Sequence, residues 1–161
     1  MGYTHYFRRI PGYDRAAYAA LCADVSAIVG SLRDAGSPLA GPLGEGLPEI
    51  TAERVAFNGA APDDYETFSW EANCCHWDPY AKPGARVFCF CKTAQRPYDV
   101  AVVAVLLCAH YHYGDAVTLG SDGDASELGP GLALARSIFP SRGLTLAPFG
   151  VTEGASCQGD A

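Results

Sequence analysis

Strand-like patterns of apolar and polar residues occur in five short segments, at residues 2–10, 53–57, 65–71, 86–91 and 116–119. Aromatic and β-branched side chains, which favour strands, are common in these segments. The turn-forming residues between the second and third segments predict a hairpin with a long loop. Residues 86–91 are apolar on both faces, which is typical of a central strand.

Apolar residues recur at helical spacing in three longer segments. The first follows Asp14, a residue type that caps helix N-termini, and is expected to end at Gly36. The second, residues 97–113, is apolar on nearly all sides, which predicts a helix buried in the core. The third is expected to start near Leu132, because Pro130 between two glycines disfavours an earlier helix.

The order of these elements predicts an α+β fold, with one mostly antiparallel sheet of about four or five strands and about three helices. A chain of 161 residues is long enough for one domain with its own core. We expect that domain to span residues 1–148. Residues 149–161 are rich in glycine and polar residues and are expected to form a loose tail.

Composition excludes some classes of protein. Hydrophobic residues make up 49% and charged residues 18% of the chain, as in globular proteins rather than disordered ones. The net charge of -7 argues against nucleic acid or an anionic membrane as the main partner. A small phosphate ligand in a local pocket is compatible with this charge. The longest apolar run, residues 100–109, is too short to span a membrane.

The N-terminal residues lack the apolar region of a secretory signal, and seven cysteines is an odd number. Reduced, mostly buried thiols are therefore expected, with the protein in the cytoplasm of a host cell or in a virion.

Several short motifs occur in order along most of the chain. They are "GYTHYF" at 2–7, "FNG" at 57–59, "ETF" at 66–68, "FCKTAQRPYD" at 90–99, "GD" at 114–115 and "SDGD" at 121–124. In these motifs the chain resembles a family of small uncharacterised proteins from phages, bacteria and large DNA viruses. The resemblance implies a possible viral setting but no settled activity.

The segment "FCFCKTAQRPYD", residues 88–99, joins a predicted strand to the predicted core helix. Lys92, Thr93 and Arg96 precede Pro97, which suits the first turn of a helix. Two cations and a hydroxyl beside free helical N–H groups predict a site for a phosphate or carboxylate. The alternative is a well-capped joint, in which Asp99 complements the helix dipole.

Other polar residues of the motifs lie near predicted strand ends, where they could join the same site. These ligand-binding candidates are Asn58, Glu66 and Asp122. Each also has an ordinary structural explanation, because Asn58 and Asp122 precede glycines in turns and Glu66 could pair with Arg96.

Neither a metal nor another cofactor is expected. Cys74, Cys75 and His76 precede Cys89 and Cys91, but these cysteine pairs lack the spacing of zinc-binding turns. The common nucleotide-binding and hydrolase motifs are absent from the sequence as well.

We therefore expect a binding or interaction protein rather than an enzyme, with a small anionic ligand or a protein as partner and possible self-association. A second hypothesis is an enzyme with Cys91 as nucleophile, His5 as base, and Lys92 or Arg96 holding a phosphate. A third is a structural component of a viral assembly.

Overall fold

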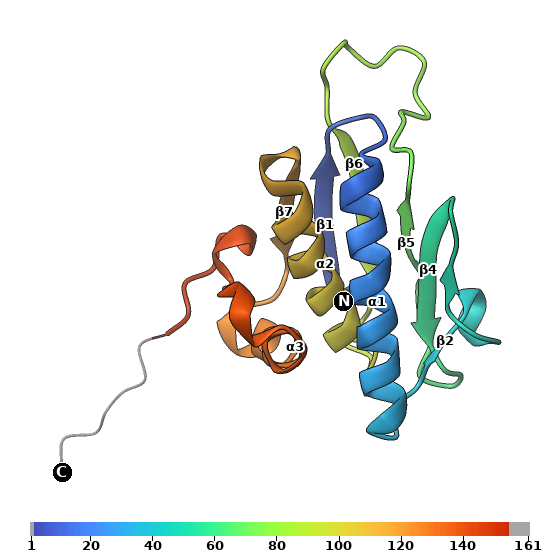
Figure 1. The fold of residues 1–161 in the computed structure, drawn as a ribbon, viewed down its shortest axis with the longest axis vertical. Helices are drawn as coiled ribbons and strands as arrows, with labels where there is room; N and C mark the ends of the chain where they lie inside the picture. The colour runs from blue at the N-terminus through green and yellow to red at the C-terminus, as the bar shows by residue number, and fades with distance from the viewer. Residues whose placement is uncertain (1, 155–161) are drawn as a thin grey trace.

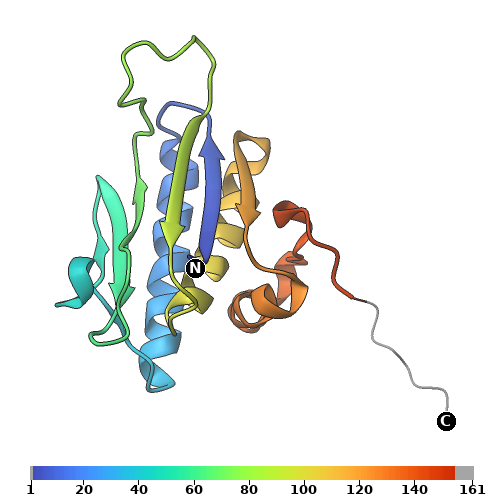
Figure 2. The same ribbon diagram turned by 180° about the vertical axis from the view of Figure 1, so that it is seen from behind.

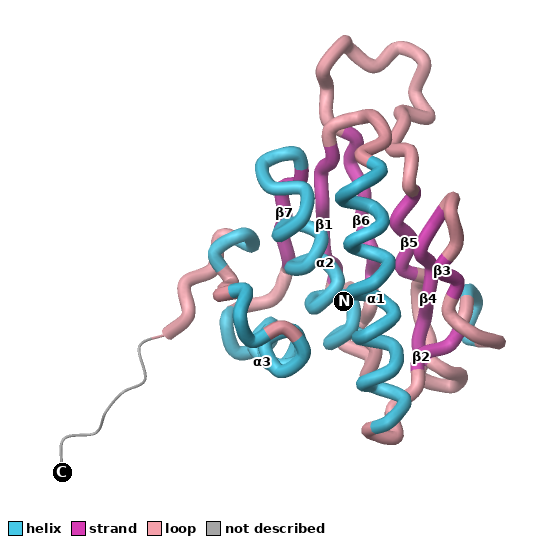
Figure 3. The backbone as a smooth tube through the Cα atoms, in the orientation of Figure 1, coloured by secondary structure: helices cyan, strands magenta, loops and turns pink. Residues whose placement is uncertain are grey.

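Three helices and two small antiparallel sheets make up the computed structural model, which describes residues 2–154 (Figures 1 and 3). The strands are β1 (Thr4–Arg9), β2 (Leu39–Ala40), β3 (Glu49–Ile50), β4 (Arg54–Gly59), β5 (Phe68–Glu71), β6 (Val87–Lys92) and β7 (Val117–Ser121). The helices are α1 (Arg15–Asp34), α2 (Asp99–Tyr113) and α3 (Ala125–Ile138). This arrangement confirms the predicted α+β class.

The strands divide between two sheets rather than forming one. The first has the order β6-β1-β7; in the second, β4 pairs with β2, β3 and β5. The predicted hairpin of β4 and β5 is thus confirmed. The sheets adjoin where the Glu66 backbone N–H donates to the Lys92 carbonyl oxygen, at 3.3 Å. β5 begins only at Phe68, so the pairing does not continue along β6.

β1, not β6, is the central strand of the first sheet. The prediction of a central strand at residues 86–91 was wrong, because the apolar residues on one face of β6 are exposed to solvent. Phe88 is 48% exposed and Phe90 is 57% exposed. Figure 2 shows why: α1 and α2 lie behind the three strands, and the opposite side of the sheet has no helix over it.

The core lies between the helices and both sheets, and it includes Phe57 of β4 and Trp70 of β5. Every residue of α2 from Ala101 to Ala109 is buried, which confirms the predicted core helix. α1 contributes an apolar stripe that includes Leu21, Val25 and Ile28, all fully buried. By length and composition alone, α1 would also pass as a membrane-spanning helix.

The starts of α1 and α3 are set by capping residues. The Asp14 side chain accepts a hydrogen bond from the Ala17 N–H at 2.9 Å, so α1 starts where predicted. α3 starts earlier than predicted and continues through Pro130. Asp124 and Glu127 form a capping box at its start, and this local stabilisation offsets the hydrogen bond that the proline cannot donate.

The chain stays packed beyond residue 148. Phe149 is buried, and Glu153 pairs with Arg136 at 2.9 Å. Contacts with the rest of the chain thus continue to Glu153, inside the predicted tail, and the rest of that tail, residues 155–161, lies outside the described residues. Between β5 and β6 a long loop projects past the ends of the strands (Figure 3), and Trp77 and Tyr80 in it are each 91% exposed.

Candidate functional site

The three residues of the predicted anion site have different surroundings. Lys92 is the last residue of β6, and its side chain packs against Gly2. Thr93 is fully buried, and its hydroxyl donates to Oδ1 of Asp99. Arg96 is exposed and has no carboxylate within ion-pair distance among residues 2–154. The structure therefore does not gather the three side chains around one anion.

The backbone of this junction is well hydrogen-bonded. The N–H groups of Thr93 and Ala94 both donate to the Tyr3 carbonyl oxygen, at 3.0 and 3.2 Å. The Asp99 N–H donates to the Arg96 carbonyl oxygen at 2.8 Å. These bonds hold two residues that are not glycine, Ala94 and Gln95, at positive φ angles of 50° and 55°. Of the alternative explanation, a well-capped joint, the structure shows Asp99 in the first turn of α2, but the N-cap residue, Tyr98, makes no side-chain cap hydrogen bond.

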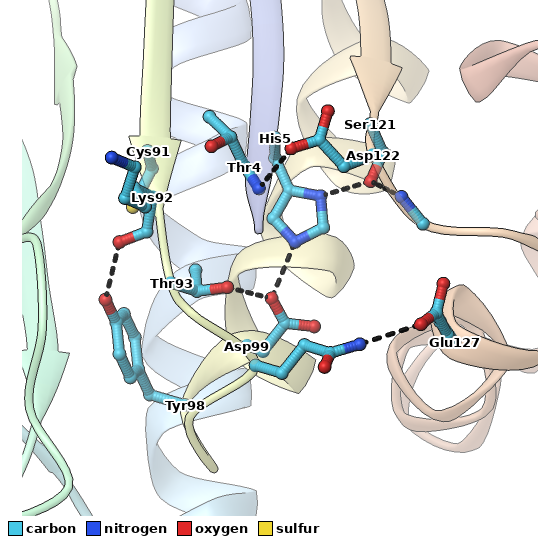
Figure 4. Close-up of polar contacts among 12 residues, drawn as sticks. Thr4, His5, Cys91, Lys92, Thr93, Tyr98, Asp99, Ser121, Asp122 and Glu127 are labelled. Carbon is cyan, nitrogen blue, oxygen red and sulfur yellow. Dashed lines mark hydrogen bonds and ion pairs between the residues drawn. The ribbon is translucent and has the colours of Figure 1, made fainter. Parts of the chain in front are cut away.

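Behind the joint, His5 is the centre of a buried polar network (Figure 4). Its Nε2 lies 2.6 Å from Asp99 Oδ1, and its Nδ1 lies 2.9 Å from Ser121 Oγ. The Ser121 oxygen also accepts a hydrogen bond from the Gly123 N–H at 3.0 Å. A neutral imidazole fits these contacts with its proton on Nε2, facing the carboxylate, and with Nδ1 accepting the serine proton. The network joins β1, α2 and β7.

Tyr3 lies against this network. Its ring packs edge-on to the His5 ring, with 5.3 Å between centroids. Its hydroxyl is buried and has no hydrogen-bond partner of normal geometry. Burial, followed by the Asp99 charge, raises the pKa of Tyr3 to about 12, and the neighbouring Ser121 side chain opposes this rise. A Cβ atom on Gly123 would lie only 2.1 Å from that hydroxyl, so this turn requires glycine.

Cys91 does not have the surroundings of a reactive thiolate. It is 1% exposed, and its Sγ donates to the Glu66 carbonyl oxygen at 3.7 Å. Burial, followed by the charges of Glu66 and Asp99, raises the pKa of Cys91 to about 12. The nucleophile hypothesis needed a lowered pKa. It also needed His5 as base, but both ring nitrogens of His5 face Asp99 and Ser121.

The remaining candidates have structural partners. Asn58 is fully buried and holds the β4–β5 turn, accepting from Gly59 N–H at 2.8 Å and donating to the Tyr65 carbonyl at 3.0 Å. Glu66 Oε2 accepts from the Lys92 N–H at 2.9 Å. Asp122 Oδ2 accepts from the backbone N–H of Thr4 at 3.0 Å.

Asp122 has a second contact on the exposed side of the sheet, because its Oδ1 accepts a hydrogen bond from the Tyr6 hydroxyl at 3.0 Å. Alternate residues of the three strands point to this side. We call it the outer face; it consists of Tyr6 and Arg8 of β1, Phe88, Phe90 and Lys92 of β6, Thr118 and Gly120 of β7, and Asp122.

Aromatic rings cover the middle of the outer face. The Tyr6 and Phe88 rings stack with 6.0 Å between centroids and 22° between planes. The Arg8 guanidinium lies 5.3 Å from the Phe88 centroid, and Phe90 is 6.0 Å from Phe88. Gly120, which pairs with Tyr6 in the sheet, adds no side chain, and a hollow of about 380 Å³ lies there.

A smaller hollow of about 240 Å³ lies beside the joint, between Arg96 and Glu127 and bordered by Tyr3 and Asp99. Glu127 is already engaged, since Gln95 donates to it at 2.8 Å. Two carboxylates beside one guanidinium make this hollow a poor match for the predicted anion site. Among residues 2–154, no group of three or more His, Cys, Asp or Glu side chains is placed to hold a metal ion.

Neither the contact between Ser121 and His5 nor the aromatic cluster of the outer face was predicted from the sequence. In the sequence Ser121 appears only as the first residue of the motif "SDGD", and its contact with His5 depends on strand pairing that no local pattern reveals. Part of the outer face could have been predicted from "FCFCK", because alternation along a strand places Phe88, Phe90 and Lys92 on one side.

No protein-family model, curated protein sequence or solved structure matches the chain. The family resemblance drawn from the short motifs therefore stays a prediction, as do the viral setting and the self-association.

Proposed function

We propose that the protein binds a small ligand in which a flat ring is joined to an anionic group, and that the outer face is its binding surface. The sequence predicts a binding or interaction protein with a small anionic ligand or a protein as partner, and this proposal takes the small ligand. The location differs, because the proposed surface is the exposed side of the sheet rather than the 91–99 junction. The observation that carries the proposal is the exposed Tyr6–Phe88 stack with the Arg8 guanidinium beside it.

The ring part of the ligand is inferred from the aromatic platform. Exposed aromatic side chains scattered singly are ordinary, but Tyr6, Phe88 and Phe90 are neighbours on one uncovered sheet face. A ring laid on such a platform removes apolar surface from water and stacks on the π-face. Stacking of this kind contributes about 1–3 kcal/mol for each base in proteins that bind single-stranded nucleic acids.

The anionic part is inferred from the cations. Arg8 is exposed, and among the described residues no carboxylate lies within ion-pair distance of it. Lys92 lies on the same face of β6 as Phe88, at the opposite end of the strand from Arg8. A free guanidinium against a ring can hold a phosphate or carboxylate through two hydrogen bonds. In a protein of net charge -7, this favours a small anion rather than a long polyanion.

The size of the hollow limits the ligand. A volume of about 380 Å³ is at the lower end of the range for small-molecule sites. The glycine at 120 leaves the space beside Tyr6 open, so a larger residue there would fill part of it. A mononucleotide or an aromatic carboxylate fits the ring, charge and size.

Calorimetric titration with adenosine monophosphate, adenosine and inorganic phosphate tests the proposal. Wild type is expected to bind the nucleotide more tightly than either part alone. Arg8→Gln removes the charge that meets the phosphate, and should weaken nucleotide binding at least about tenfold while changing adenosine binding little. Phe88→Leu should weaken both, by roughly fivefold to a hundredfold, because it removes the stacking surface.

Arg33→Gln is the matched control, since Arg33 is an exposed arginine on α1 with a side chain 68% exposed. It should bind like wild type. Equal loss of binding in Arg33→Gln and Arg8→Gln would show a general effect of charge and contradict the proposed surface. Absence of binding of all three compounds and of 1-naphthoate, an aromatic carboxylate, would reject the ligand class.

A further inference from the structure

We propose that Ser121 is a nucleophile toward small carboxylic esters, with His5 as its general base. This activity is separate from the outer face, because Ser121 and His5 pair across strands on the inner side of the same sheet. Either proposal can therefore fail without the other.

The first argument is the order and spacing of the groups. Asp99, His5 and Ser121 form a chain of hydrogen bonds of 2.6 and 2.9 Å, as a serine nucleophile with a base and an orienting carboxylate requires. Thr93 also donates to the same Asp99 oxygen, which fixes the carboxylate. The base here is Nδ1 rather than Nε2, but the chemistry needs only one free ring nitrogen toward the serine.

The second argument is the Tyr3 hydroxyl. It is a buried polar group without a partner, in a side chain only 9% exposed, and it lies against Gly123 next to the serine. Buried polar groups normally have partners, so an unpaired donor here calls for an explanation. With a pKa raised by burial to about 12, Tyr3 keeps its proton and can donate to a developing oxyanion.

The third argument is access. Ser121 is the last residue of β7 and is partly exposed, although His5 is not. The hollow of about 240 Å³ is lined by two other groups of the network, Tyr3 and Asp99, and not by Ser121 or His5. Figure 4 shows Ser121 and Asp99 at the two ring nitrogens of His5. We take small esters as the substrate class, because the open space beside Tyr3 and Asp99 is small.

The reaction balances without a cofactor. The Ser121 oxygen bonds to the ester carbonyl carbon as its proton passes to His5 Nδ1, and the carbonyl electron pair moves to the oxygen, which Tyr3 meets. Collapse breaks the bond to the alcohol oxygen, which takes the proton from Nδ1. Water then attacks the acyl-serine by the same route. The products are one carboxylic acid and one alcohol.

A fluorophosphonate probe followed by intact mass and peptide mapping gives the most direct test, together with hydrolysis of p-nitrophenyl acetate. We expect one adduct on wild type, located at Ser121, and no adduct on Ser121→Ala. His5→Gln should slow labelling at least about a hundredfold. Ser137→Ala, which removes an exposed α3 hydroxyl, should label like wild type.

Tyr3→Phe is expected to fold even if other variants do not, because it removes a hydroxyl that has no hydrogen-bond partner of normal geometry. Its activity therefore tests the proposal independently of the other variants. Tyr3→Phe should retain the wild-type circular dichroism spectrum and slow ester hydrolysis about a hundredfold. An unlabelled wild type, an adduct at any residue other than Ser121, or wild-type hydrolysis by Tyr3→Phe would overturn the proposal.

Discussion

The two faces of the β6-β1-β7 sheet use the same residue types in opposite ways. On the inner face, Phe7 is 2% exposed and stacks on Trp70 with 5.3 Å between centroids. On the outer face, Phe88 stacks on Tyr6 but is 48% exposed. The helices cover only one side, so aromatic residues stabilise the fold on that side and are free to meet a partner on the other.

Neighbouring arginines on β1 show the same contrast. Arg9 is 4% exposed, lies 3.9 Å from the Trp70 centroid and donates to the Glu71 carbonyl oxygen at 2.9 Å. Arg8 is exposed beside Phe88. Consecutive residues of a strand point to opposite faces of the sheet. Arg9 is therefore part of the core, whereas Arg8 is accessible to a ligand.

Two histidine–aspartate pairs extend the comparison within the interior. His112 Nε2 lies 2.7 Å from Asp24, much like the His5–Asp99 pair at 2.6 Å. Arg142 completes the first pair with two hydrogen bonds to Asp24, at 2.5 and 2.9 Å. That cluster is a closed ionic clamp between α1, α2 and the segment after α3. The His5–Asp99 pair instead contacts the hydroxyl groups of Ser121 and Thr93, which can exchange protons.

The largest expected effect is a difference in stability between substitutions on the inner and the outer face of the sheet. Phe7→Ala should lower the free energy of unfolding by about 3–5 kcal/mol, because it removes a buried ring and leaves a cavity. Phe90→Ala, on the outer face, should change it by no more than about 0.5 kcal/mol. Urea denaturation measures both, and similar losses would show that the outer face is also packed.

Removing Arg142 should lower the free energy of unfolding somewhat less than Phe7→Ala does. Arg142→Ala leaves Asp24, whose side chain is 6% exposed, without its cation, and breaking a buried pair from one side costs about 3 kcal/mol. Arg136→Ala is the control, because its pair with Glu153 is 47% and 41% exposed and should contribute less than about 1 kcal/mol. Equal unfolding midpoints for the two variants would contradict the clamp.

The clamp also predicts a pH dependence. Burial alone would raise the pKa of Asp24, but hydrogen bonds from Arg142 and His112 outweigh it and lower the pKa. A lowered folded-state pKa stabilises the protein above the unfolded value, near pH 4, and this stabilisation is lost as the pH falls through the folded value. Asp24→Asn cannot titrate, so its unfolding midpoint between pH 2 and 7 should fall less on acidification than that of wild type. A parallel fall would refute the assignment.

The smallest effect concerns thiols. With a pKa of about 12, Cys91 is almost entirely protonated at pH 8, and it is buried as well. Iodoacetamide at pH 8 should modify Cys75, which is exposed, and leave Cys91 unmodified by peptide mass mapping. Rapid alkylation of Cys91 in the folded protein would contradict this prediction and support the hypothesis that Cys91 is a nucleophile.

Local patterns predicted the fold class, the Asp14 cap and the buried helix, because each depends on residues close in sequence. They did not predict the division into two sheets or the position of β6 at a sheet edge, since these depend on which strands pair. The candidate site divides in the same way. The sequence pointed to His5 as a candidate base and to Asp122 as a polar residue near a strand end. Their partners Ser121 and Tyr6 come together only through the pairing of β1 with β7.

The most direct test of the binding surface is a nuclear magnetic resonance titration of ¹⁵N-labelled protein with adenosine monophosphate. The account predicts saturable amide shifts that cluster at Tyr6, Arg8, Phe88 and Gly120, with Arg96 and Asp99 unaffected. Shifts that cluster instead at Arg96 and Asp99 would place the anion at the joint, and would contradict the claim that the outer face is the ligand-binding surface.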